Sequence, residues 1–218
     1  MKKPLAPVIL LAAAVLFAAA APSVDAQTSP DCDIKKITPL LLNSPQIAAE
    51  YSRKPGQNRP PQWLEVDVEF DMPQTSKTGP KFADELTVNY YILLNNKDAT
   101  EDRKPTLLTG SVSHADVPYG KGLHVGAFVS PQTMLRFFDG KAPGNINQTV
   151  VDVGVTVSDA SGVIARHALK SAVRGEKGWW DNTADFSEVT GRVLDKDATP
   201  FAHLSWDYYL PPKSKAGL

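Results

Sequence analysis

The sequence predicts an all-β fold: an immunoglobulin-like antiparallel β-sandwich of about seven or eight strands with one short helix. Three observations predict this class. Some segments alternate apolar and polar residues, others are rich in β-branched and aromatic residues, and turn residues separate them at short intervals. Cys32 is the single cysteine of the 218 residues, so no internal disulfide is possible and the core must depend on apolar burial.

Residues 1–26 are predicted to be a signal peptide in front of the fold. Two lysines precede a long apolar run, residues 4–21, and the tripeptide ending at Ala26 provides a cleavage site, so the mature chain is expected to begin at Gln27. The alternative is an uncleaved anchor, because a run of this length could just span a bilayer. The run is rich in alanine and a polar segment follows it directly, which favours cleavage. We therefore expect an exported protein in the periplasm, at the cell surface or outside the cell, without stable membrane insertion.

The lead-in to the domain, residues 27–61, contains a possible edge strand. Residues 34–42, IKKITPLLL, are apolar enough for a strand, and Pro39 confines it to an edge because proline cannot donate to a ladder. Such an edge offers backbone groups that another chain can complete, and the segment could itself be donated to a partner. The candidate residues of this edge or donor strand are Ile34, Ile37, Leu40 and Leu42. Just before it, Cys32 is expected to be an unpaired thiol and not a lipid anchor, since Asp31 precedes it.

The sandwich domain is predicted to span residues 62–210 and to begin with a strand at 62–70. The even-numbered apolar residues of this strand lie on one side and its acidic residues, such as Glu65, on the other, which is the pattern of a strand with one face in water. Trp63 falls on the polar side, a conflict that the sequence leaves open. Residues 85–94 are too evenly apolar at their end for a solvated face, which predicts a central strand.

Turn and capping residues define the remaining elements. Further strands are predicted at residues 106–114, 122–129, 148–159, 162–173 and 201–210. The first two flank a loop rich in turn residues, and the next two form a hairpin whose turn ends at Gly162, a residue that adopts positive φ at little cost. Ser130 as a cap and Pro131 at the first helical position predict a short helix. Residues 211–218 are predicted to be a tail.

Composition and motifs argue against several classes of function. A formal net charge of −1 without a basic run gives no case for binding nucleic acid or a membrane surface. His114 and His124 flank one loop, but zinc needs at least three protein ligands. Asp195 and Asp197 resemble the start of a calcium loop whose other ligands are missing. No nucleophile motif or phosphate-binding loop is present. We therefore expect no metal, no cofactor, no catalytic residues and no enzymatic activity.

Aromatic residues near the C-terminus form the candidate interaction surface. Trp179 and Trp180 are adjacent, so in an extended segment both cannot point inward. An exposed indole could stack on a sugar or fill a pocket of a partner. The alternative is that both rings fold over the sandwich as a plug. Trp206 and Tyr208 form a second aromatic group and complete the candidate surface.

Four segments, in this order, resemble a known family: PPQWLEVDVEF, FADELTVNYYILL, LLTGSVSHADVPYGKGLHVGAFVSPQTMLRFF and TPFAHLSWDYY. They are similar to the secreted pilus-like proteins encoded beside type IV pilus machinery in mucin-degrading gut bacteria. The resemblance implies a signal peptide, an immunoglobulin-like sandwich and a non-enzymatic surface or pilus-associated role. It transfers no active-site residues. No prepilin signal precedes the apolar run, so a standard type IV pilin is not expected.

These features lead to two expected functions. The first is a structural or assembly component associated with a pilus-like surface apparatus, which acts through β-strand association with other surface or pilus-apparatus proteins or with further copies of itself. The alternative is a glycan-binding surface module that stacks sugars on exposed tryptophans.

Overall fold

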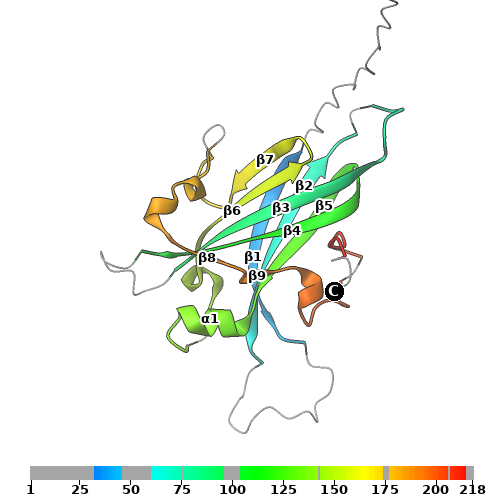
Figure 1. Cartoon of the computed structure of the whole chain (residues 1–218). Coiled ribbons are helices and arrows are strands. Elements are labelled where there is room, and N and C mark those ends of the chain that lie inside the picture. Colours follow the sequence, from blue (N-terminus) through cyan, green and yellow to red (C-terminus); the bar gives the residue numbers. More distant parts are fainter. Residues whose placement is uncertain are drawn as a thin grey trace, which may run out of the picture.

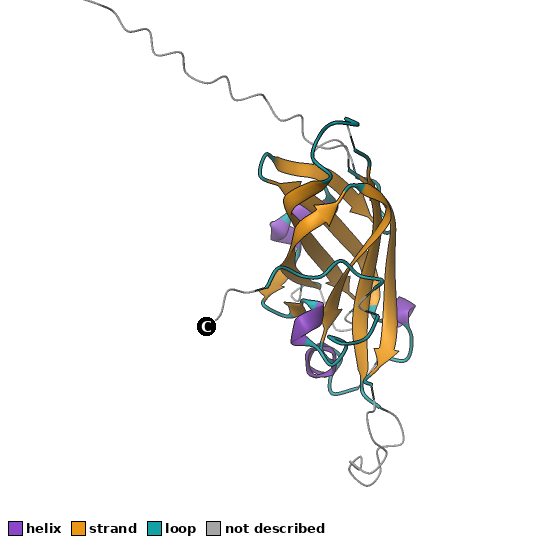
Figure 2. Cartoon of the chain, turned by 90° about the vertical axis from the view of Figure 1, so that its right-hand side faces the viewer, coloured by secondary structure: helices purple, strands orange, loops and turns teal. Residues whose placement is uncertain are grey.

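The computed structural model describes residues 32–45, 60–74, 76–95, 104–141, 143–173, 177–205 and 207–214. In this part of the chain two β-sheets pack face to face as a sandwich (Figure 1; Figure 2). The predicted signal peptide lies outside the described residues. Within the ranges given above, no helix is long and apolar enough to cross a membrane.

The first sheet contains four strands in the order β1-β2-β5-β9. Their bounds are β1 Asp33–Asn43, β2 Gln62–Met72, β5 Gly120–Val129 and β9 Val193–Leu194. The second sheet contains five strands in the order β7-β6-β3-β4-β8. Their bounds are β3 Phe82–Leu94, β4 Thr106–Pro118, β6 Val150–Asp159, β7 Gly162–Ala168 and β8 Ser187–Thr190. All pairs are antiparallel except β4 with β8, which is parallel.

The helical elements are short. They are α1 Pro131–Phe137 and the 3₁₀ turns η1 Ile146–Gln148, η2 Trp179–Asp181, η3 Thr183–Asp185 and η4 Lys196–Ala198. Helix α1 begins as predicted, with the Ser130 side chain accepting a hydrogen bond from the Thr133 backbone N–H and Pro131 in the first turn.

The strand order confirms the predicted all-β sandwich. In an immunoglobulin domain one sheet begins with strands A, B and E, and the other contains G, F and C, with C′ beside C in the variable type. Here β1-β2-β5 and β7-β6-β3-β4 have the same orders. Strands β8 and β9, of four and two residues, add to this pattern and are too short for an alternation to predict them.

The core lies between the two sheets and is filled by every second residue of the long strands. Leu64, Val66, Val68 and Phe70 of β2 are fully buried, as are Val88, Tyr90, Ile92 and Leu94 of β3 and Val153, Val155 and Val157 of β6. This inner face matches the alternation in the sequence, and its apolar area is the main source of stability in a domain without a disulfide.

The outer face of β2 is covered and not in water, so the predicted wet face is wrong. Glu65 and Asp67 are only 5% and 9% exposed. Trp63, on the same face, packs against Phe201 with ring centroids 5.9 Å apart, and Phe128 stacks on Phe201 at 5.4 Å. The conflict over Trp63 is resolved because its side of the sheet carries a second, smaller apolar cluster under the C-terminal part of the chain.

Within residues 201–210, predicted to be a strand, the described residues 201–205 and 207–209 form turns and bends. The Leu204 N–H donates to the Phe201 carbonyl at 2.9 Å and the Tyr208 N–H to the Ser205 carbonyl at 3.2 Å. Ser205 has a φ of 48°, in the left-handed region that no strand residue adopts. The aromatic residues here cover the outer face of a sheet, and turns supply such side chains as readily as a strand does.

The two strands around residue 119 do not form a hairpin. Strand β4 pairs in the five-stranded sheet and β5 in the four-stranded sheet, so the chain crosses the sandwich between Pro118 and Gly120. His114 and His124 therefore lie on strands of different sheets. The hairpin of β6 and β7 is confirmed, with Gly162 at a φ of 126°, although β7 ends at Ala168 and not at residue 173.

Trp180 covers the outer face of the five-stranded sheet. Its ring stacks on Tyr91 with centroids 5.0 Å apart, and it packs with Leu107 and Ala168. Beneath it lies Gly154 of β6, where an added Cβ atom would be 2.0 Å from Trp180 Cε3. Only glycine leaves space for the indole at this point of the strand.

We expect Gly154→Ala to destabilise the protein by about 1–3 kcal/mol, because the new methyl group forces Trp180 out of its contact with the sheet. Urea denaturation followed by tryptophan fluorescence measures this change. Gly120→Ala is the matched control, since a Cβ atom there meets only Leu123 Cδ2 at 3.8 Å. Equal midpoints for the two variants would contradict the role assigned to Gly154.

Candidate functional site

Strand β1 forms one edge of the four-stranded sheet, as the sequence predicts. It pairs with β2 from Asp33 to Asn43, and no strand among the described residues pairs with its other side. Strand β7 forms the edge of the second sheet on the same side of the sandwich, and the two strands contact each other there (Figure 1). In the described part of the chain neither β1 nor β7 has a hydrogen-bonded neighbour on this side of the sandwich, which is here called the open side.

The four candidate residues of β1 divide into two groups. Ile34 and Ile37 are 5% and 4% exposed and belong to the main core, so they anchor the strand and cannot meet a partner. Leu40 and Leu42 point to the outer face, where Leu42 packs against the Trp63 cluster and Leu40 is 41% exposed. Of the four, Leu40 is the residue that another chain could contact.

The β1 edge carries features that limit unwanted pairing. The register shifts between Ile34 and Lys36, which marks a bulge, and Pro39 stands opposite Val66 of β2. Since proline has no N–H, it fits where the backbone faces the open side, and it removes one donor from that side. Lys35 is paired with Asp33 and lies 3.7 Å from Asp71. A strand added to β1 would therefore have to match a specific, interrupted edge.

Cys32 precedes β1 and packs partly buried against the core. Burial raises the pKa of its thiol to about 12, and the nearby carboxylate of Asp33 adds to the shift. A thiol with so high a pKa forms almost no thiolate at neutral pH and is a poor nucleophile. The cysteine therefore acts here as a small apolar residue.

The opposite side of the sandwich is closed by the C-terminal part of the chain. Strand β9 covers β5 only at Phe128 and Val129, and β8 covers β4 only from Thr106 to Thr109. Beyond these pairs the segment Tyr208–Lys213, here called the C-terminal clasp, bonds to both strands. The Leu210 N–H donates to the His124 carbonyl at 2.8 Å, and the Lys213 N–H to the Ser113 carbonyl at 2.6 Å.

A buried histidine holds the middle of the clasp. His114 is 2% exposed, and its Nδ1 lies 3.0 Å from the Pro211 carbonyl oxygen, so the ring donates from Nδ1 to the clasp. Burial lowers the pKa of His114, while its hydrogen bonds to the Pro211 and Leu210 carbonyls and the charge of Asp195 oppose that shift. The neutral ring thus fills the end of the sandwich between the sheets.

Two tyrosines of the clasp cover the carboxylates of β2. The Tyr209 hydroxyl donates to Glu65 at 2.9 Å, and the Tyr208 hydroxyl to Asp67 at 3.2 Å. His124 completes this cluster, with Nδ1 3.0 Å from the other oxygen of Asp67 and its ring 4.1 Å from that of Tyr208. Burial and the two carboxylates raise the pKa of Tyr208 to about 12 and that of Tyr209 further.

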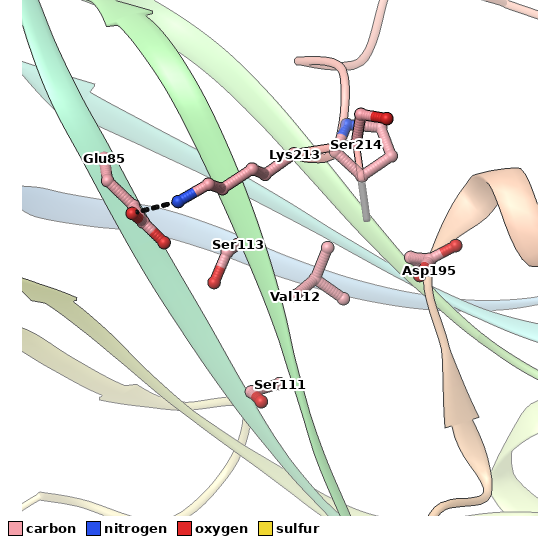
Figure 3. A pocket seen from close by; sticks show the side chains of 8 residues that line it. Glu85, Ser111, Val112, Ser113, Asp195, Lys213 and Ser214 are labelled. Carbon is pink, nitrogen blue, oxygen red and sulfur yellow. Dashed lines mark hydrogen bonds and ion pairs between the residues drawn. The ribbon is translucent and has the colours of Figure 1, made fainter. Parts of the chain in front are cut away.

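A small hollow lies along the edge of β4, between the end of its pairing with β8 at Thr109 and the clasp residues Pro212 and Lys213 (Figure 3). Its volume is about 360 Å³. Ser111 and Ser113 of β4 line it, and Lys213 reaches across to Glu85 with Nζ 2.6 Å from Oε2 (Figure 3). In the described residues no group of three His, Cys, Asp or Glu side chains is placed to hold a metal ion.

The aromatic residues predicted as an interaction surface do not share one surface. Trp180 is 2% exposed and plugs the five-stranded sheet, and Trp179 packs against Phe186 at 5.5 Å, so the two rings fold over the sandwich. Tyr208, 47% exposed, lies over the other sheet in the clasp, and Trp206 lies outside the described residues. A sugar-stacking platform that includes Trp180 is therefore contradicted.

Sequence reasoning missed the residues that close the sandwich. Tyr209, Leu210 and His114 were not candidates for this role, because their partners lie more than eighty residues away in the sequence. Two features of the sequence could have indicated them. One is a pair of acidic residues on a strand that also carries Trp63, and the other is a Tyr-Tyr pair shortly before two prolines.

Comparisons with known proteins place the chain. A family model matches residues 22–216. A search of the curated proteins gave no match. Among solved structures, the crystal structure of a protein from Akkermansia muciniphila matches with a TM-score of 0.67 and 23% sequence identity, over 85% of this chain and 93% of that chain. At this identity the likeness shows a shared fold.

The Glu65 carboxylate under the clasp is expected to make the free energy of unfolding depend on pH. Burial raises the pKa of Glu65, with the charge of Asp67 adding to the shift and the Tyr209 hydrogen bond and Lys196 opposing it. In the unfolded state the pKa of glutamate is about 4.3, so around and above this pH the folded state binds more protons than the unfolded state. The free energy of unfolding therefore falls as the pH rises from about 4.3 through the pKa of Glu65 in the folded state. Glu65→Gln keeps an oxygen for Tyr209 and removes the charge.

We expect Glu65→Gln to raise the free energy of unfolding at pH 7 and to flatten its dependence on pH above about 4.3. Denaturant titrations between pH 4 and pH 8 measure both effects. Glu69→Gln on the same face of β2, which is less buried, serves as the control. A Glu65→Gln protein less stable than the wild type at pH 7 would show that the carboxylate charge is needed beneath the clasp.

Proposed function

The chain belongs to the family whose model matches residues 22–216. On this premise we propose that it is a non-enzymatic exported protein and a structural or assembly component of a pilus-like surface apparatus. It acts by β-strand association, with the open β1 edge as the contact surface. Its partners are other proteins of that apparatus or further copies of itself.

The observation that carries this proposal is the difference between the two sides of the sandwich. On one side the edges of β4 and β5 are covered by β8, β9 and the C-terminal clasp. On the other side β1 pairs with β2 alone among the described strands. A strand edge offers a row of backbone donors and acceptors to another chain, and main-chain bonding of this kind gives affinity without a deep pocket.

The side chains of β1 support a role as a fixed docking edge and not as a donated strand. Ile34 and Ile37 are built into the core, so removing β1 from the sheet would uncover buried apolar surface. The strand therefore stays in its own sandwich and receives a partner strand at its free side. The glycan-binding alternative loses support because Trp180 is buried.

We expect the mature chain to sediment with surface filaments that are sheared from producing cells. Immunoblotting of the sheared fraction, the periplasm and the cell bodies measures its distribution. A cytoplasmic marker and a periplasmic marker control for lysis and leakage. A chain found only in the soluble periplasm would contradict a role at the filament.

We expect Leu40→Lys to reduce the amount of chain in the sheared fraction about tenfold, which corresponds to roughly 1.4 kcal/mol. Lysine on an edge strand opposes the addition of another strand. Position 40 stands opposite Glu65, so the new charge brings no like-charge repulsion into the monomer, and stability should stay within about 0.5 kcal/mol.

Leu204→Lys is the matched control, because Leu204 is 46% exposed and lies in the C-terminal turns and not on β1. It should leave the sheared fraction unchanged. Equal loss in both variants would mean that added charge, and not the β1 edge, disturbs assembly. An undiminished Leu40→Lys fraction would remove β1 from the proposal.

A further inference from the structure

We propose that the space between the edges of β4 and β5 in which the clasp lies, here called the channel, is a docking site for a peptide with the sequence of the C-terminal clasp, and that a second copy of the chain can supply it. Two chains would then exchange their clasps. This inference deepens the proposed function, because it gives strand association a second contact surface, but it depends on residues that β1 does not touch.

The contacts of the clasp are those of a peptide bound to strand edges. Its backbone bonds to β5 through the His124 carbonyl and to β4 through the Ser113 carbonyl, at 2.8 and 2.6 Å. A buried side chain, His114, donates from Nδ1 to the Pro211 carbonyl oxygen at 3.0 Å. Main-chain bonds of this kind provide affinity for an added segment, and side-chain pockets then select its sequence.

The pockets of the channel fit the clasp residue by residue. The Tyr209 ring lies over Gly126, where a Cβ atom would be 3.1 Å from Tyr209 Cε1. Its hydroxyl reaches Glu65 at 2.9 Å. Leu210 packs against the main core, and the Lys213 ammonium pairs with Glu85 at 2.6 Å. The site therefore recognises an aromatic residue with a hydroxyl, an aliphatic residue and a cation in that order.

The segment that joins the clasp to the domain can act as a hinge. The described backbone hydrogen bonds of residues 201–205 run only to near neighbours in the C-terminal segment, which include Thr199, Tyr208 and Tyr209, and to no strand. Ser205 holds a φ of 48°, which is costly for a residue with a Cβ atom. Pro211 and Pro212 keep the second half of the clasp extended whether or not it is docked, so this half loses little conformational freedom on docking.

A second copy is the occupant that these features favour. Each copy carries both the channel and the segment that fits it, so exchange replaces every contact by an identical one. Exchange of an identical element costs little beyond the loss of independent motion of the two chains. Chains held close together on a surface have a high effective concentration, which offsets that loss.

Disulfide trapping between two full-length variants tests this exchange. One variant carries Ser113→Cys and the other Lys213→Cys, whose positions are joined by the 2.6 Å backbone hydrogen bond, and both carry Cys32→Ala so that no other thiol is present. The two proteins are mixed at high concentration, incubated, oxidised and separated on a non-reducing gel. We expect a disulfide-linked heterodimer whose yield rises with the time of incubation before oxidation.

Two controls make the result decisive. Lys170→Cys in place of Lys213→Cys presents an exposed thiol after β7, at the other edge of the same sheet, and measures random collision. The double variant Ser113→Cys/Lys213→Cys should form the disulfide within one chain, and failure to do so would overturn the docking of the clasp on β4. A heterodimer yield no greater than that of the Lys170→Cys control, with the internal disulfide formed, would overturn the exchange. Neither result depends on the outcome for Leu40→Lys.

Discussion

The need to satisfy the edge strands of two open sheets determines most of this structure. A sandwich that does not close into a barrel leaves unpaired backbone groups at the margins of each sheet, and these must be covered or must bind something. Here β8, β9 and the clasp cover the margins of β4 and β5, while β1 and β7 remain at the other margin in the described chain. The strands β8 and β9 are short, and each covers only the part of an edge that the clasp does not cover. The C-terminal part of the chain contacts both sheets and so reaches both margins.

Covering one margin has an electrostatic consequence. The clasp crosses the outer face of β2 and buries Glu65 and Asp67, which water would otherwise solvate. Burial of a carboxylate is unfavourable unless hydrogen bonds replace its water, and the hydroxyls of Tyr208 and Tyr209 provide that replacement. The clasp is thus both the cause of the burial and its compensation, so the segment and the carboxylates are expected to act as one unit.

The sequence predicts those features of the fold that depend on neighbours along the chain. The inner face of β2 follows from its alternation, α1 from Ser130 and Pro131, and the edge position of β1 from Pro39. Features that depend on distant contacts could not be predicted in this way. Glu65 and Tyr209 are 144 residues apart, and alternation alone cannot tell a face covered by water from one covered by the end of the chain. The aromatic residues near the C-terminus gave a true signal of a covering segment, but their spacing was that of turns and not of a strand.

The two association surfaces lie at opposite margins of the sandwich, and this placement has consequences for assembly. A chain with one contact edge can form a pair in which the same edge of both copies meets, and growth then stops. A pair that exchanges its clasps reciprocally fills both channels, so it leaves no edge at β4 and β5 uncovered. Each of its two copies still presents a β1 edge at the opposite margin, and contacts at that edge continue from pair to pair and extend the assembly into a row.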